Sequence, residues 1–449
     1  MGSAVETLMG LATADNRFDL PYREILPTQL AAADERFQAR RDVIKLLGHR
    51  AEEGGVSRVA SLEAIVPLLF AHTTYKSYPE SWLAEQKWDR MNRWLATVSS
   101  QPVTGVDLDG IQGIDDWIAR LERAGHYVSC SSGTTGKSAM LNATRQDMDW
   151  TGRDSVLACA WGTGVAPAQD RRMFGLAPIA SVPRNLLIRE ALADAFGEPG
   201  AEPFIYPVPP ITIGSITGMV ALRKAMADGT ARPGDVAAFE TLSAERQRAV
   251  DAAVGLSAQA LVEARRSKLY ISGMWATLYK VAEAVRAMGY GGEDFHPENT
   301  IYVGGGLKGA VLPDDYREYV YETLNLSPRR VFQMYGMQEI NSAMPRCAAG
   351  RYHVPPWLIC LPLDQEGETL IPAGGDEEVE GRAAFFDLSL DGRWGGVISG
   401  DRIKVRFGRC ACGHQGPAIA DDITRYSDLP GGDKISCAGT IDAYVRGVA

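Results

Sequence analysis

The stretch SSGTTGKS, residues 131–138, carries most of the information about the fold of this 449-residue sequence. Seven of its eight residues are Ser, Thr or Gly, and the eighth is Lys137. Gly133 and Gly136 allow backbone N–H groups to converge on an anion, and Lys137 adds a positive charge. Hydroxyl donors come from Ser131, Ser132, Thr134 and Thr135. The composition of this segment predicts a loop that binds a polyphosphate.

Two other interpretations of the loop are weaker. The Walker A pattern, G-x-x-x-x-G-K-[ST], matches at Gly136-Lys137-Ser138, but its first glycine would fall on Ser131, which disfavours a P-loop NTPase. A flexible Ser/Gly linker is the bland alternative. It is disfavoured because a strand-like run, residues 126–130, precedes the loop and a segment with ordered character follows it.

The segment SSGTTGK resembles the phosphate loop of the adenylate-forming superfamily, which includes acyl-CoA synthetases, nonribosomal peptide adenylation domains and luciferases. Within it, the chain is most similar to the phenylacetate-CoA ligase branch and the related acyl-protein synthetases. The superfamily loop usually ends in Pro-Lys, whereas this chain has Ser138-Ala139 there. The phenylacetate branch also tends to lack the final lysine. The resemblance implies that residues 131–136 and Lys137 bind the phosphates of ATP, with Lys137 acting in catalysis.

Hydrophobic patterns along the chain agree with an α/β fold. Residues 1–125 have mainly helical patterns, for example at 28–50. Strand and helix patterns alternate from about 170 to 310, residues 352–407 are predicted to form strands with turns, and residues 126–425 are the expected nucleotide- and acyl-binding α/β core. The resemblance implies a large N-terminal domain of several subdomains, with mixed sheets flanked by helices. Residues 426–449 are then a hinge and the start of a C-terminal lid domain that is absent or incomplete here.

Three later segments fall in the order that the family requires. Gly304-Gly305-Gly306 follows a strand pattern, and in the family this backbone lies against adenine; an ordinary strand-to-helix turn is the alternative. The run 335–339 resembles Tyr-Gly-x-Thr-Glu, which implies that Tyr335 stacks on adenine and Glu339 holds Mg²⁺. A buried tyrosine and a surface glutamate are the alternative. Gly336 matches the motif, whereas Gln338 replaces the threonine that touches the α-phosphate.

The run 399–402 resembles the Thr-Gly-Asp segment, whose aspartate binds both ribose hydroxyls. A carboxylate has the acceptors that a vicinal diol needs, so Asp401 is the predicted ribose ligand; a β-turn aspartate is the alternative. Arg425 is a candidate nucleotide-binding residue and, together with Asp433, a candidate hinge residue.

A metal site is predicted at Cys347, His353, Cys410 and Cys412. Thiolate and imidazole are preferred Zn²⁺ ligands, and three cysteines with one histidine form a common closed structural site. Some phenylacetate-ligase-like proteins show a similar arrangement. Three ordinary reduced cysteines and a surface histidine are the alternative, and His414 is a spare candidate ligand.

The acyl pocket of the family is expected near Ala177, Gly273, Trp275 and Gly304. Small residues beside one aromatic side chain suggest room for a ring, so we expect an aromatic or cyclic acid.

Composition narrows the class of protein further. The net charge is −10 and no basic stripe is visible, so nucleic acid is not an expected partner. No membrane span and no secretory signal are predicted, and seven cysteines without such a signal favour a reducing compartment, the cytoplasm. Both a monomer and a homodimer are compatible with the sequence.

The predicted reaction joins a carboxylic acid to CoA through an acyl-adenylate, with ATP consumed and AMP released. No convincing Ser-His-Asp or Cys-His set competes with this mechanism. Gln338 and the lack of a later Gly-Lys segment leave two relatives of this reaction open: thioester formation from a supplied acyl-adenylate, and acyl transfer to a protein. A zinc-stabilised nucleotide-binding protein without catalysis is the alternative from another class.

Overall fold

The computed structural model describes residues 2–130, 137–305, 310–430 and 432–433. Within these ranges, no helix combines the length and the apolar character needed to cross a membrane. The chain forms two compact units, one made of the residues up to Asp154 and from Tyr335 onward, the other of Ser155–Met334. These cuts differ from the boundaries at 125 and 425 that the sequence suggested.

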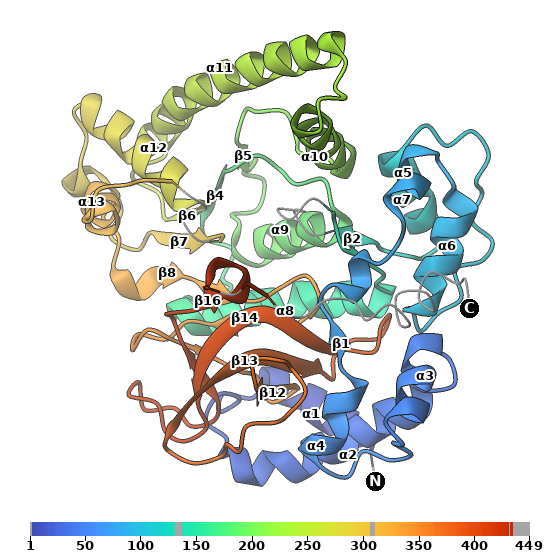
Figure 1. Cartoon of the computed structure of the whole chain (residues 1–449). Coiled ribbons are helices and arrows are strands. Elements are labelled where there is room, and N and C mark those ends of the chain that lie inside the picture. The colour runs from blue at the N-terminus through green and yellow to red at the C-terminus, as the bar shows by residue number, and fades with distance from the viewer. Residues whose placement is uncertain (1, 131–136, 306–309, 431, 434–449) are drawn as a thin grey trace. The chain divides into compact units, whose positions relative to one another are not determined.

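The first unit is built on a mixed sheet in the order β11-β15-β14-β13-β12, with the short strands β1 and β16 also paired to β14. Its centre is the antiparallel pair β13–β14, whose register includes Phe385 opposite Val397. Figure 1 shows these long strands as a strongly curved surface. The strands of the sheet are β1 (Phe70–Ala71), β11 (Arg351–His353), β12 (Leu358–Leu363), β13 (Glu378–Asp387), β14 (Gly396–Arg406), β15 (Ala418–Ala420) and β16 (Thr424–Arg425).

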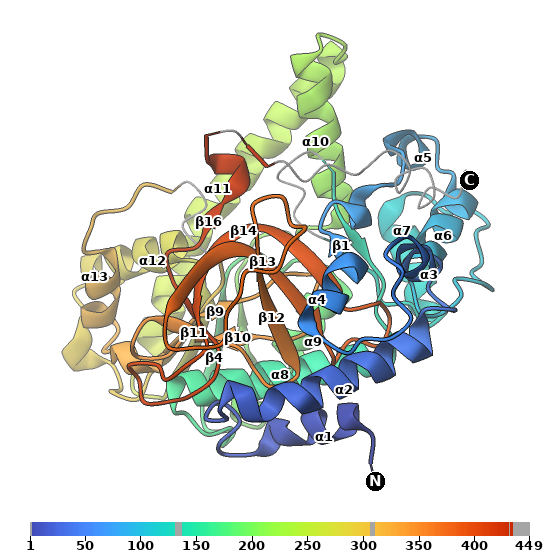
Figure 2. The same cartoon turned by 60° about the horizontal axis from the view of Figure 1, so that its bottom comes forward.

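Aromatic side chains attach the N-terminal helix α2 (Tyr22–Arg40) to this sheet unit. The ring of Tyr22 lies 4.6 Å from that of Phe407, and Phe37 lies 6.1 Å from Trp394. Figure 2 shows α2 running beneath the sheet. Burial of large rings of this kind is the main stabilising contribution, at about 25 cal/mol per Å² of apolar surface.

The rest of the first unit is mainly helical between residues 2 and 125. Trp88 and Trp117 stack there with their ring centroids 5.6 Å apart, so the tryptophans of this part are core residues. The remaining elements are α1 (Ala4–Gly10), α3 (Lys45–Glu53), α4 (Leu62–Ile65), α5 (Glu80–Ala84), α6 (Trp88–Thr97), α7 (Ile114–Arg123), β2 (Ser129–Cys130), β3 (Met140–Leu141), α8 (Arg145–Thr163, which continues into the second unit), β9 (Met334–Tyr335) and β10 (Met344–Pro345).

The second unit contains a five-stranded parallel sheet in the order β5-β4-β6-β7-β8. Helices connect the parallel strands, as such a sheet requires. The core packs α12 and α13 against the central strands through buried apolar residues such as Ile271, Leu278 and Val320. The elements are β4 (Arg172–Leu176), α9 (Pro183–Phe196), β5 (Phe204–Ile205), α10 (Ile213–Ala227), α11 (Pro233–Glu263), β6 (Leu269–Gly273), α12 (Trp275–Ala287), β7 (Thr300–Val303), α13 (Tyr316–Thr323) and β8 (Val331–Phe332).

Candidate functional site

The predicted phosphate loop connects the two strands of a hairpin. β2 and β3 pair antiparallel, with Ser129 opposite Leu141 and Cys130 opposite Met140. Residues 131–136 lie outside the described residues, so their predicted role stays a prediction. Lys137 is described, and its ammonium lies 4.4 Å from the centre of the Tyr78 ring. The Tyr78 hydroxyl donates to the carbonyl of Ser138 at 2.7 Å, which fixes the end of the loop to the helical part of the unit.

Tyr335 and Asp401, which belong to two different predicted motifs, lie side by side. The hydroxyl of Tyr335 donates to Oδ2 of Asp401 at 2.8 Å. Burial, and then the negative charge of Asp401, raise the pKa of the Tyr335 phenol, so it keeps its proton and acts as the donor. The ring of Tyr335 is packed in the core of the sheet, 6.0 Å from the ring of Phe385.

Arg425 meets the same carboxylate from the neighbouring strand. β14 and β16 pair with Asp401 directly opposite Arg425, and Nε of Arg425 lies 3.7 Å from Oδ1 of Asp401. The Arg425 side chain is 62% exposed and that of Asp401 is 18% exposed. The carboxylate is therefore held on both oxygens and is still partly open to a ligand. A carboxylate has about four acceptor positions, so these two neighbours leave room for hydroxyl donors.

Glu339 follows Tyr335 in the same segment and is partly exposed, as are Gly336 and Gln338. Lys76 lies within electrostatic range of this carboxylate. Burial lowers the pKa of Lys76, whereas the negative charge of Glu339 raises it and the charge of Arg425 lowers it again. One carboxylate at a partly exposed position fits Mg²⁺, which typically binds one or two carboxylates together with substrate phosphates.

Three of the small residues predicted to line the acyl and adenine sites meet in the second unit. β4, β6 and β7 are neighbours, with Leu176 opposite Gly273 and Gly273 opposite Val303. Ala177 and Gly304 directly follow these strand ends, and the N–H of Gly304 donates to the carbonyl of Gly273 at 3.0 Å. The carboxyl edge of a parallel sheet is the usual place for a ligand. Gly305 has φ +72°, a conformation that favours glycine, and Gly306 lies outside the described residues.

Trp275 is only 2% exposed and belongs to the core of the second unit. Its ring lies 5.3 Å from that of Tyr316 and 6.0 Å from that of Tyr321. Trp275 follows the end of β6 closely in the sequence, but its ring is packed among aromatic rings. A direct contact between Trp275 and an acyl group stays a prediction.

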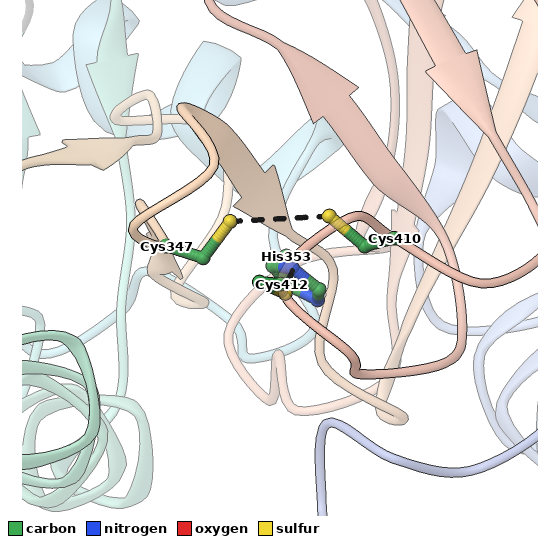
Figure 3. A group of neighbouring side chains, drawn as sticks. All are labelled: Cys347, His353, Cys410 and Cys412. Atoms are coloured by element: carbon green, nitrogen blue, oxygen red, sulfur yellow. Dashed lines mark hydrogen bonds between the residues drawn. The ribbon is translucent and has the colours of Figure 1, made fainter.

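The four predicted metal ligands converge in the first unit. The ligand atoms of Cys347, His353, Cys410 and Cys412 all lie within 4.8 Å of one another, and Figure 3 shows the side chains pointing toward a common centre. Sγ of Cys412 lies 3.3 Å from Nε2 of His353, and Sγ of Cys347 lies 4.0 Å from that of Cys410. Tetrahedral zinc with ligand distances of about 2.0–2.3 Å needs ligand atoms about 3.3–3.8 Å apart. The separations of 3.3 Å and 4.0 Å are close to this range, so the donor set fits zinc.

Two turns of the same design present three of these ligands. In CAAGR, residues 347–351, the N–H of Cys347 donates to the carbonyl of Arg351, and the N–H of Gly350 donates back to Cys347. In CACGH, residues 410–414, Cys410, Gly413 and His414 repeat both bonds. Gly350 and Gly413 have φ +77° and +98°, which explains the glycine in each turn. The C-A-x-G pattern occurs at both turns, so this repeat is a second sequence signal for the site, in addition to the spacing of the ligands.

Burial of the site favours neutral imidazole at its histidine. Burial, followed by the charges of His414 and Arg351, lowers the pKa of His353 to about 4. At neutral pH its ring is therefore uncharged and offers a lone pair to a metal. The pairing of β11 with β15, in which His353 lies opposite Ala418, brings the two ligand loops together.

Several residues around Glu339 were not predicted. Lys76 precedes the phosphate loop by about sixty positions, and only the structure places it near Glu339. Asp147 and Arg393 are 0% and 2% exposed. Asp147 accepts from the side-chain amide of Asn341, and Arg393 donates to the carbonyl of Glu339. A signal exists for Asp147, because Thr144-x-x-Asp147 is a capping box: the N–H of Thr144 donates to Asp147, and that of Asp147 donates to the Thr144 hydroxyl.

Comparison with solved structures identifies the fold. No family model matches the chain, and no curated protein matches it in sequence. An open conformation of 2-hydroxyisobutyryl-CoA ligase in complex with 2-HIB-AMP and CoA aligns over 94% of this chain and 82% of its own, with 14% identity and a TM-score of 0.53. The same ligase in the thioesterification state aligns over 91% and 70%, with 15% identity and a TM-score of 0.52. This chain therefore has the fold of that ligase, with mixed sheets flanked by helices, as the resemblance to the adenylate-forming superfamily implied.

Proposed function

We propose that this protein is an AMP-forming acid–thiol ligase that converts a carboxylic acid to its acyl-adenylate and transfers the acyl group to CoA. The observation that carries the proposal is the hydrogen bond between Tyr335 and Asp401, which are 66 positions apart in the sequence. It joins the predicted adenine-stacking residue to the predicted ribose ligand, as a nucleotide site requires. The solved ligase of the same fold holds an acyl-adenylate and CoA, which supports this reaction.

The proposed first step is attack of a carboxylate oxygen on the α-phosphorus of ATP. A P–O bond to the bridging oxygen breaks, and pyrophosphate leaves. In the second step a thiolate attacks the acyl carbon, the C–O bond of the mixed anhydride breaks, and AMP leaves. Neither step needs a nucleophile from the protein. Its contribution is to place the reactants and to stabilise negative charge on the phosphates.

We assign these tasks to the residues of the motifs. Asp401 and Tyr335 bind the ribose and the adenine, and Arg425 stands beside the carboxylate. Lys137 and residues 131–136 bind phosphates, and Glu339 holds Mg²⁺. When bound, Mg²⁺ supplies positive charge against the phosphate oxygens. Gly304, Gly305 and Gly306 lie against adenine, and Gln338 replaces the usual contact to the α-phosphate.

For the acid, we propose an aromatic or cyclic body bound near the strand ends at Ala177, Gly273 and Gly304. Small side chains at all three positions support room for a flat group. The solved ligase of the same fold binds 2-HIB-AMP, and at 14–15% sequence identity its acid is not assigned to this chain.

The metal site at Cys347, His353, Cys410 and Cys412 is proposed to hold a structural Zn²⁺. Four protein ligands leave no open position for a substrate, which is the property of structural rather than catalytic zinc. One turn lies between β10 and β11 and the other between β14 and β15, so the ion would tie these two connections together.

Exchange of labelled pyrophosphate into ATP tests the adenylation step. The assay takes the protein, ATP and Mg²⁺ with a panel of aryl, fatty and polycyclic acids, and thioester formation with CoA is followed by mass spectrometry. The proposal expects exchange with at least one free acid, abolished in Asp401→Ala and retained in the matched surface variant Asp422→Ala. Asp422 forms an exposed ion pair with Lys404 and serves as the control.

Gln338 favours one second candidate, a ligase that only converts a supplied acyl-adenylate to a thioester. Thioester formation from a synthetic acyl-adenylate without any pyrophosphate exchange would establish that candidate. Binding of AMP without either reaction would identify a non-catalytic nucleotide-binding protein. A wild-type protein that binds no AMP would overturn all three.

A further inference from the structure

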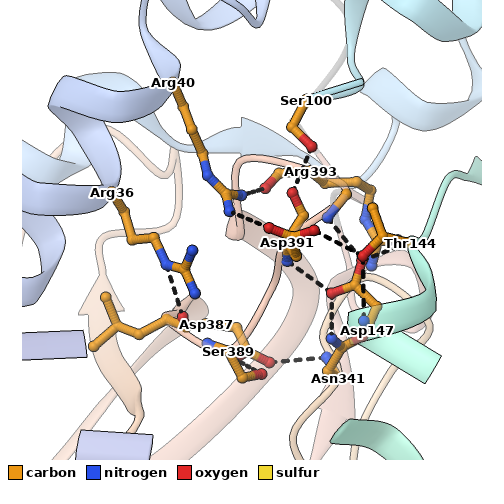
Figure 4. A network of polar contacts seen from close by, with 12 residues as sticks. Arg36, Arg40, Ser100, Thr144, Asp147, Asn341, Asp387, Ser389, Asp391 and Arg393 are labelled. Atoms are coloured by element: carbon orange, nitrogen blue, oxygen red, sulfur yellow. Dashed lines mark hydrogen bonds and ion pairs between the residues drawn. The ribbon is translucent and has the colours of Figure 1, made fainter. Parts of the chain in front are cut away.

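The eight residues between β9 and β10, residues 336–343, form neither helix nor strand. This segment contains Glu339. Its main-chain groups therefore lack partners from regular secondary structure and must be satisfied in another way. Buried charged side chains provide those partners, and they come from distant parts of the first unit (Figure 4).

Arg393 binds the carbonyl side of this segment. Its Nη2 donates to the carbonyl oxygens of Gln338 at 3.4 Å and Glu339 at 3.3 Å, and its Nη1 donates to that of Asn142 at 2.5 Å. Asn142 directly follows β3, the second strand of the phosphate-loop hairpin. One guanidinium thus joins the base of that hairpin to the segment that carries Glu339.

Aspartates bind the N–H side of the same segment. Oδ2 of Asp387 accepts from the N–H groups of Asn341 at 2.8 Å and Ser342 at 2.9 Å. Asp154 accepts from the N–H of Ala343 at 2.7 Å. Three successive N–H groups, those of residues 341–343, therefore donate to carboxylates, which hold the main chain after Glu339.

Asp147 connects this frame to the rest of the unit. Its Oδ1 accepts from the side-chain amide of Asn341 and from the N–H of Asp391, both at 2.7 Å. Its Oδ2 accepts from the N–H groups of Thr144 at 2.9 Å and Gly392 at 2.7 Å. A Cβ on Gly392 would lie 2.8 Å from this oxygen, so the close approach requires glycine.

Further groups balance the charge of the frame. Arg40 donates to the carbonyl of Arg393 and lies 3.3 Å from the carboxylate of Asp391, and Arg36 donates to the carbonyl of Leu388 at 3.0 Å. A buried network of this kind is weak evidence for extra stability, because well-packed apolar residues often stabilise a core equally well. Its distinctive property is that it fixes geometry.

We propose that Arg393 is a positioning residue for Glu339: with Asp147 and Asp387 it fixes the main chain of residues 338–342, and so the place at which the Glu339 carboxylate meets Mg²⁺ and the phosphates. The inference rests on the proposed function, since it concerns the same site. Arg393 does not contact the nucleotide in this proposal. It acts through the backbone of the residue that does.

The test compares nucleotide binding with and without the metal. Titration calorimetry gives the Kd of ATP in excess Mg²⁺ and in EDTA. The Kd in EDTA divided by the Kd in Mg²⁺ reports the metal-dependent part of binding. Arg393→Lys keeps the charge but loses the fork that reaches two sets of carbonyls. Asn341→Ala removes only the amide that donates to Asp147 and is the milder second variant. The thermal midpoint of each protein is measured alongside.

Arg171→Lys is the matched control. Arg171 is 4% exposed, belongs to the second unit, and donates to the carbonyl of Glu298 and the hydroxyl of Thr300. It shares with Arg393 the burial and the binding of main-chain oxygen but contacts no predicted motif. A loss of stability alone therefore appears in both arginine variants.

We expect Arg393→Lys to lower the ratio about tenfold, as is typical for a residue that orients a metal ligand, with the Kd in EDTA unchanged within about twofold. Asn341→Ala should lower the ratio in the same direction, and decides the matter alone if Arg393→Lys does not fold. Arg171→Lys should leave it unchanged. A ratio equal to wild type in the folded variants, together with a lower thermal midpoint, overturns the positioning role while the proposed function stands. A wild-type protein whose ATP affinity does not depend on Mg²⁺ overturns the assigned role of Glu339, and this inference with it.

Discussion

Replacing Tyr335 by phenylalanine removes a single oxygen from the proposed nucleotide site. The ring would keep its packing, because it lies among the apolar side chains of the sheet core and 6.0 Å from the ring of Phe385. Adenine stacking on that ring is therefore preserved. What is lost is the donor that holds Oδ2 of Asp401 at 2.8 Å. The variant isolates the orientation of the ribose ligand from the shape of the site.

The size of the effect follows from the surroundings of Asp401. A hydrogen bond to a charged group contributes about 1.5–3 kcal/mol when its partner stays buried. The Asp401 side chain is 18% exposed, so water replaces part of the lost bond, and Arg425 still faces its other oxygen at 3.7 Å. We therefore expect the lower end, about 1.5 kcal/mol, which corresponds to roughly a tenfold weaker Kd for AMP.

Titration calorimetry with AMP measures this change. Tyr206→Phe is the matched control, because Tyr206 is 2% exposed, lies in the second unit, and donates its hydroxyl to the carbonyl of Val250. The double variant Tyr335→Phe/Asp401→Asn should be little weaker than Asp401→Asn alone, since the tyrosine acts through the aspartate. An unchanged Kd in Tyr335→Phe would refute the reasoning. A tighter Kd would show that the phenol competes with the ribose for Asp401.

Three further predictions concern other parts of the first unit. Cys410→Ser should release the bound zinc and lower the thermal midpoint. Cys360 is a buried cysteine of the core, so Cys360→Ser should lower the midpoint but keep one zinc per chain by elemental analysis. Wild-type protein without zinc would contradict the site. Lys76→Met should slow pyrophosphate exchange about 100-fold through loss of a cation near Glu339, and Lys404→Met, from an exposed ion pair, should not; equal rates in both would exclude a role for Lys76. Burial lowers the pKa of His72, so folding favours its uncharged form, and this contribution to stability is lost as the pH falls below about 6.5. The thermal midpoint of wild type should therefore drop more than that of His72→Gln between about pH 7.5 and 5.5. Parallel curves for the two proteins would contradict this.

Most of the architecture was predictable because it depends on local patterns. The apolar strand patterns near 172–176 and 300–303 predicted an α/β arrangement, and the structure places both strands in one parallel sheet. Helix ends were less predictable. The pattern at 28–50 suggested one helix, but α2 ends at Arg40 and α3 begins at Lys45. Arg40 is drawn into the buried network around Asp391 and Arg393, so a tertiary contact overrides the local helical pattern.

The motif residues of the candidate site could be named from the sequence, whereas the buried residues that hold those motifs in place could not. Asp401 and Tyr335 could be named because each belongs to a motif with a known order along the chain, and the structure brings these two together. Arg393 carries no motif of its own, and the capping box that contains Asp147 predicts only the start of a helix. Their partners lie 194 positions away in Asn341 and 251 positions away in Asn142, and no spacing rule connects such positions.

The supporting contacts also bear on the effect of Gln338. Arg393, Asp387 and Asp154 all bind main-chain groups of residues 338–343, and main-chain groups are the same for every residue type. Gln338 can therefore replace the usual threonine without changing the path of the backbone on which Glu339 sits. The side chain of Glu339 is under chemical constraint, whereas its neighbours are constrained only through their carbonyls and N–H groups. We therefore expect the main-chain path at Glu339 to be largely independent of the side chain at position 338. Replacing Gln338 by threonine tests that reasoning directly: the exchange rate should change by less than about tenfold, the size of a single neutral hydrogen bond, and a larger gain would show that the amide obstructs the α-phosphate.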